Sequence, residues 1–164
     1  METQQTTPPE PAAERPFRVA KIELDVALEV PPPRAWAALT RDASSWWPND
    51  FCTSPQRVKA FHLEPRLGGR FYEDWGDGNG WVWWTIYLFD ADHFTLTARG
   101  LEGAASTTTV RFTLSQSPGG CVLKISERVW GDLPDNVVPS HVNGWRYLFQ
   151  ERFKPYVERA KTAT

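Results

Sequence analysis

Apolar and polar residues alternate strictly over residues 21–30, which read KIELDVALEV. A period of two predicts a β-strand with one buried face. Three prolines follow at 31–33 and end this strand, because proline cannot donate to a strand ladder. Two short helices are expected next, over residues 34–40 and 42–48, since Pro33 suits a first helical turn and Asp42 can cap the second helix.

Six more strands are predicted between turn signals, at 59–64, 70–75, 81–89, 94–99, 107–115 and 121–130. Their connections are short and rich in glycine, which favours an antiparallel sheet. Residues 138–160 are expected to form a long amphipathic helix. At about 100° per residue, its apolar stripe contains Val138, Val142, Trp145, Phe149 and Tyr156. Pro155 is expected to kink the helix near its end.

This order of elements predicts an α+β helix-grip fold: a curved antiparallel sheet of six to seven strands around the long C-terminal helix, with two short helices after the first strand. Residues 1–16 are rich in Thr, Gln, Pro and Glu and lack large apolar side chains after Met1. Such a segment buries too little surface to order itself. The sequence therefore predicts a disordered tail over 1–16 and one domain over 17–164.

Composition excludes several classes of protein. The balance of 18 basic and 20 acidic residues gives no electrostatic footprint for nucleic acid. No apolar stretch approaches the roughly 20 residues that span a membrane, and the N-terminus lacks the pattern of a secretory signal. The two cysteines fit a reducing compartment, so a cytoplasmic location is expected. Three histidines and two cysteines form no metal-ligand spacing, and neither a metal nor a cofactor is predicted.

Several motifs together resemble the START/Bet v 1-like (SRPBCC) superfamily. They are VPPPRAWAALT at 30–40, the Trp46–Trp47 pair, EPRLGGRF at 64–71, GWV at 80–82 and Gly144–Trp145 with its trailing helix. Within the superfamily they most resemble the branch named after the activator of Hsp90 ATPase homologue 1. The resemblance implies an apolar ligand cavity between sheet and helix. It implies no single activity, because the superfamily includes lipid carriers, aromatase/cyclases and hormone-binding proteins.

Three titratable residues are candidates for acid–base chemistry. Glu127 shares the inward parity of its strand, and Glu73 sits between Phe71 and Trp75 on another inner face. A carboxyl group in an apolar pocket has a raised pKa and can act as an acid or base. His141, about one turn before Trp145, can pair with Glu127 across the cavity mouth. The alternatives are that both carboxylates lie solvated or arginine-paired at the rim, and that the histidine is structural.

A ligand site is predicted from the helix stripe. Trp75, Trp145 and Phe149 would supply apolar contact, although the nine tryptophans could equally fill the core. Arg152 falls in the same stripe. An inward guanidinium needs Glu127, Glu73 or an anionic ligand as its partner, whereas one at the stripe's edge reaches water.

The leading hypothesis is therefore the binding of a small hydrophobic ligand, with an anionic group as one option. The alternatives are a cyclase/dehydratase-type enzyme that uses Glu127 or Glu73 with His141, and a chaperone-linked protein-interaction module.

Residues 81–89 are apolar on both parities of their strand. A sheet that is buried on one side should have a polar outer face. We therefore expect the outer side of this strand to be covered by the N-terminal tail or by a second subunit. A homodimer is the simpler of these two expectations.

Overall fold

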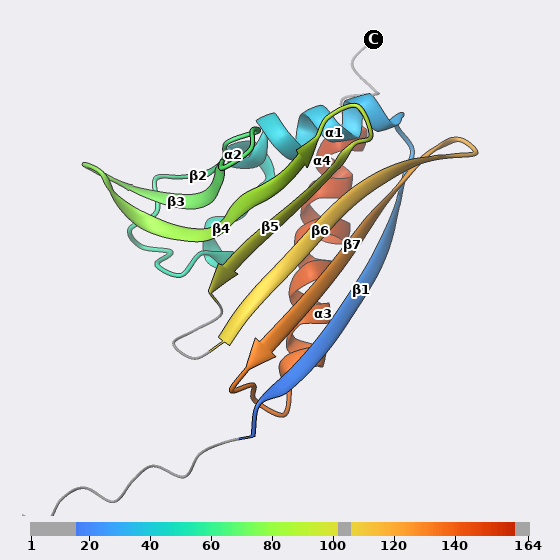
Figure 1. Cartoon of the computed structure of the whole chain (residues 1–164). Coiled ribbons are helices and arrows are strands. Elements are labelled where there is room, and N and C mark those ends of the chain that lie inside the picture. Colours follow the sequence, from blue (N-terminus) through green and yellow to red (C-terminus); the bar gives the residue numbers. More distant parts are fainter. Residues whose placement is uncertain (1–15, 102–105, 160–164) are drawn as a thin grey trace, which may run out of the picture.

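A computed structural model describes residues 16–101 and 106–159 (Figure 1). Nearly all of the predicted N-terminal tail lies outside the described residues. The domain begins at the strand β1, and its long C-terminal helix lies across one side of a strongly curved sheet (Figure 1). The α+β helix-grip prediction is confirmed.

Seven antiparallel strands form the sheet, in the order β1-β7-β6-β5-β4-β3-β2. Two short helices follow β1, as predicted, and a 3₁₀ turn (η1) comes after them. The Asp42 side chain does not cap the second helix and instead accepts a hydrogen bond from Tyr156. The bounds are β1 Arg18–Leu28, α1 Pro32–Arg41, α2 Ala43–Trp46, η1 Asn49–Phe51, β2 Ala60–Leu63, β3 Arg70–Gly76, β4 Asn79–Asp90, β5 Thr95–Leu101, β6 Ser106–Ser117 and β7 Gly120–Gly131.

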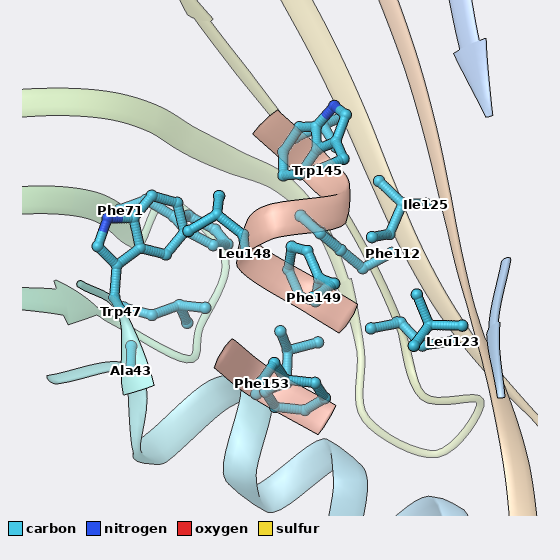
Figure 2. Packing of buried hydrophobic residues seen from close by; sticks show 14 of the residues in the cluster. Ala43, Trp47, Phe71, Phe112, Leu123, Ile125, Trp145, Leu148, Phe149 and Phe153 are labelled. Atoms are coloured by element: carbon cyan, nitrogen blue, oxygen red, sulfur yellow. The ribbon is translucent and has the colours of Figure 1, made fainter. Parts of the chain in front are cut away.

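The predicted inward parities of the two best-patterned strands are confirmed. Ile22, Val26 and Leu28 of β1 are buried, as are all of the odd-numbered residues of β7 from 121 to 131. Phe149 and Phe153 point from the C-terminal helix into the space beside Leu123 and Ile125 (Figure 2). The core is therefore a layer of aromatic and aliphatic side chains between the concave face of the sheet and the helix.

The glycine-rich turn between β2 and β3 is built by Glu64 and Arg70. The Arg70 backbone N–H and guanidinium donate three hydrogen bonds of 2.8–3.0 Å to the Glu64 carboxylate, and they hold its pKa at about 2. A Cβ atom at Gly69 would lie 2.0 Å from the Glu64 carbonyl oxygen, so only glycine fits there. The Gly68 N–H donates a hydrogen bond to the Ile86 carbonyl, and the Ile86 N–H donates one to the Gly69 carbonyl. These two bonds attach the turn to β4. This motif therefore serves the fold.

The C-terminal helix departs from the predicted periodicity. It runs as α3 Val137–Arg146, a π-helical segment Tyr147–Phe153 (η2) and α4 Lys154–Arg159. Its buried face includes residues spaced by four, namely Trp145, Phe149, Phe153 and Val157. In an ordinary α-helix, residues spaced by four move around the helix axis by about 40° at each step. The π turn contains more residues per turn, so it keeps these side chains on one face.

The C-terminal helix places two residues differently from the prediction. Arg152 is exposed, so its inward placement is wrong and the alternative in which it reaches water holds. Val138, which the regular stripe places inside, is exposed as well. The π segment ends immediately before Lys154, next to Pro155, where the sequence predicts a kink.

β4 does not keep a simple two-sided alternation. Its pairing with β3 shifts register near Trp83, and its pairing with β5 shifts near Tyr87. At the first irregularity, Trp83 turns to the inner side beside Trp84. Both indole rings then contact the ring of Trp47. The side chains left exposed on this strand include Trp81, Val82 and Tyr87.

Candidate functional site

A cavity of about 210 Å³ lies between α3, β4, β7 and the η1 turn. This volume exceeds the roughly 150 Å³ that admits benzene in an engineered apolar cavity, so it can hold a molecule of about one ring. Its walls are largely aromatic, with polar groups on one side. The lining residues are Phe51, Trp83, Trp84, Glu127, Ser140, His141, Gly144, Trp145 and Leu148.

Glu127 is the buried carboxylate of this cavity, and its side chain is 1% exposed. Its strand β7 is paired on both sides, with Ile22 of β1 and Val110 of β6 opposite Glu127. The Thr108 hydroxyl donates to Oε1 at 2.7 Å, and the Trp145 indole N–H donates to Oε2 at 2.6 Å. The carboxylate is therefore held rigidly on the inner face, as its parity predicts.

His141 completes the predicted pair with Glu127. Its Nδ1 lies 2.9 Å from Oε2, and its side chain is 15% exposed at the cavity wall formed by α3. A carboxylate on Nδ1 fixes the orientation of the imidazole ring, as it does in many acid–base sites. The arrangement is therefore chemically able to move a proton to or from a molecule in the cavity.

Glu73 is a second buried carboxylate, and it is fully inaccessible to solvent. Four neutral donors bind it: the Thr53 backbone N–H (2.6 Å) and hydroxyl (3.0 Å), and the indole N–H groups of Trp75 (3.0 Å) and Trp83 (2.8 Å). Its inward direction is as predicted, but it does not border the cavity. Glu73 reaches the cavity only through Trp83, whose indole it holds in place.

The chain's two cysteines offer no reactive thiol. Burial and the nearby Glu73 carboxylate raise the pKa of Cys52 to about 12, and burial also raises the pKa of Cys121. A thiol needs its thiolate form to act as a nucleophile. Within the described ranges, no cluster of three or more His, Cys, Asp or Glu side chains could hold a metal ion.

The predicted ligand residues separate into four places. Trp145 lines the cavity, whereas Phe149 lies in the core between Phe112, Trp46 and Phe153 (Figure 2). Trp75 is half-buried beneath the Arg57 guanidinium, 4.1 Å from its ring centroid, away from the cavity. Arg152 borders a separate surface hollow beside Tyr156 and Arg159.

Sequence reasoning missed part of the cavity wall. Phe51 comes from the η1 turn, Trp84 shares the inward parity of Ile86 on β4, and Leu148 lies on the widened helix. No local pattern in β4 marks the irregularity that brings Trp83 inward beside Trp84, because it arises in the pairing with β3. The tryptophans thus do both things foreseen for them, since some fill the core and others line the cavity.

Among the residues that the structure describes, no helix is long and apolar enough to cross a membrane. No curated protein matches the sequence. Solved structures show the same fold at low sequence identity.

An uncharacterised protein from Rhizobium leguminosarum aligns with a TM-score of 0.67 at 16% identity, covering 88% of this chain and 97% of that one. The allergen Ara h 8.0201 aligns with a TM-score of 0.61 at 18% identity, covering 85% and 98%. The solution structure of the Aha1 dimer from Colwellia psychrerythraea gives a TM-score of 0.62 at 13% identity, covering 85% and 96%.

A family model identifies the chain more narrowly than these structures do. The model described as Activator of Hsp90 ATPase homolog 1-like protein matches residues 29–158, which is most of the sequence. The match includes both short helices, six of the seven strands and the Glu127–His141 pair, and it confirms the resemblance drawn from the motifs. The chain belongs to the family of activator of Hsp90 ATPase homolog 1-like proteins.

Proposed function

We propose that this protein binds a small hydrophobic ligand in the cavity between β4, β7 and α3. The observation that carries the proposal is a cavity of about 210 Å³ with aromatic walls and an ordered polar pair, Glu127 and His141. Mostly apolar walls with a few well-placed polar groups are typical of small-molecule sites. Family and fold are consistent with ligand-binding members of the superfamily. An anionic group on the ligand is not retained, because Arg152 lies in a different hollow.

Native mass spectrometry of protein purified gently from its own host tests the proposal. We expect a non-covalent adduct on the wild-type chain. Ser140→Phe should remove the adduct, because Ser140 lines the cavity from an exposed position and a ring there would fill the space. Asn143→Phe, an exposed position on the same helix that does not line the cavity, is the matched control and should keep the adduct. Equal adduct in both variants would place the ligand elsewhere.

We also propose that the outer face of β4 is covered in a homodimer. Val82 and Tyr87 are exposed there, and large exposed apolar groups commonly mark an interface. The neighbour from Colwellia psychrerythraea is itself described as a dimer. The same native spectra report the subunit count, and a monomer at micromolar concentration would contradict the dimer. We propose a cytoplasmic location as well, in keeping with two buried free thiols.

A second candidate function, an enzyme of the cyclase/dehydratase type, is favoured by the 2.9 Å contact between His141 and Glu127. In that case Glu127→Gln should reduce turnover of the adduct molecule about 10²- to 10⁴-fold, because the amide cannot exchange a proton at neutral pH. The affinity for a neutral ligand should change only a few-fold. Turnover equal to that of the wild type would exclude this function.

A further inference from the structure

The cavity has a negative polar side and electron-rich walls. Among its described lining residues, Glu127 and His141 are the titratable ones, and Phe51, Trp83, Trp84 and Trp145 supply four aromatic rings. The ring faces of tryptophan and phenylalanine carry the negative end of a quadrupole, which attracts cations. An anionic group would therefore meet repulsion from both the carboxylate and the ring faces.

Glu127 also has acceptor capacity left. An ionised carboxylate offers about four acceptor positions on its two oxygens. Oε2 accepts from Trp145 and His141, whereas Thr108 is the one donor to Oε1 among the described residues. A ligand that donates a hydrogen bond can therefore add to this network without displacing a protein group.

The charge of Glu127 is incompletely compensated. Two of its three donors, the Thr108 hydroxyl and the Trp145 indole, are neutral. Within the described part of the chain, no lysine or arginine lies within 4.0 Å of its oxygens. His141 supplies a positive charge only when it is protonated. Since a buried unpaired charge is strongly unfavourable, a cationic group in the cavity would be stabilised by the carboxylate.

We infer that the ligand carries an amine, which sits against Glu127 as a cationic hydrogen-bond donor while the rest of the molecule contacts the aromatic walls. This inference rests on the proposed function and narrows it to one chemical class, an arylalkylamine or alkylamine of about one ring in size. The carboxylate selects the charge and the hydrogen-bond donor. Phe51, Trp83, Trp84 and Trp145 select the apolar body and add cation–π attraction.

Four probes of nearly equal size test the inference: benzylamine, benzyl alcohol, toluene and benzoate. Binding is measured by titration calorimetry at neutral pH and low salt. We expect the wild-type chain to bind benzylamine at least tenfold more tightly than benzyl alcohol or toluene, and benzoate most weakly. This ranking needs no variant, so it does not depend on the folding of a mutant.

Glu127→Gln then identifies the source of the preference. The variant should lose the tenfold advantage of benzylamine over toluene while its affinity for toluene stays within about threefold of the wild-type value. Glu23→Gln removes an exposed carboxylate from β1 and should leave all four affinities unchanged.

The outcomes separate the inference from the proposed function. Toluene binding without a preference for benzylamine, tighter binding of benzoate, or an undiminished preference in Glu127→Gln would overturn the amine inference and leave an apolar ligand site standing. If benzylamine does not bind at all, the amine inference is also overturned. The proposed function is then tested separately by the native mass spectrometry of the adduct.

Discussion

Replacing Glu73 with alanine is expected to lower the free energy of unfolding by about 3–4 kcal/mol. The substitution leaves four hydrogen-bond donors without their acceptor in a region closed to solvent: two from Thr53 and one each from Trp75 and Trp83. A buried donor that loses its partner costs about 1–3 kcal/mol, and local rearrangement or entry of water recovers part of that sum. The effect is large because one side chain joins the loop after η1 to two strands.

Urea denaturation at neutral pH measures this effect. Glu73→Gln should lie between alanine and wild type, since the amide keeps one acceptor oxygen. Glu23→Ala is the matched control on an exposed strand position, and it should stay within about 0.5 kcal/mol of the wild-type value. A loss below about 1 kcal/mol in Glu73→Ala would mean that the four donors find other partners easily, and that Glu73 is not the anchor that the geometry indicates.

The parts of the fold that were predictable from the sequence are those with a regular period. β1 alternates strictly and β7 keeps a clear apolar parity, so the pattern identified their buried faces and with them the inward direction of Glu127. The position of His141 one turn before Trp145 then brought the imidazole to the same side. The strand period directs Glu127 and the helix period directs His141 into the same interface between helix and sheet. The 2.9 Å contact between His141 Nδ1 and Glu127 Oε2 follows from these two directions.

The parts that were missed depend on breaks in the period. A regular 3.6-residue helix places Arg152 inside and Val157 toward the edge, whereas the π segment reverses this. The spacing of the large apolar residues at 145, 149, 153 and 157 was a readable signal of the wider turn. In β4, the pairing irregularity that turns Trp83 inward beside Trp84 depends on the neighbouring strand, and no local pattern specifies it.

Glu73 shows a different limit. Its parity gave its direction correctly, yet parity says nothing about partners. Three of its four donors come from Thr53 and Trp83, which lie on other elements, 20 and 10 residues away in the sequence. Whether an inward carboxylate becomes a reactive acid or a satisfied anchor depends on those distant donors, which only the three-dimensional structure brings together.

Phe149→Ala is expected to lower the free energy of unfolding by about 3–5 kcal/mol, the range typical of a phenylalanine removed from a core. The Phe149 ring is 1% exposed and lies within 5.8 Å, centroid to centroid, of Trp46, Phe112, Trp145 and Phe153. The helix stripe predicted this ring to be a ligand contact, but it does not border the cavity. Urea denaturation measures the loss.

A pair of conservative variants separates core packing from ligand contact at adjacent positions. Leu148 and Phe149 are equally buried, but only Leu148 is among the described residues that line the cavity. Phe149→Leu should therefore destabilise the fold while its affinity for toluene stays within about threefold of the wild-type value. Leu148→Val should change that affinity more, because it removes a methylene from the cavity wall. If Phe149→Leu loses as much affinity for toluene as Leu148→Val does, Phe149 contacts the ligand after all. The cavity would then extend along the helix toward Phe153.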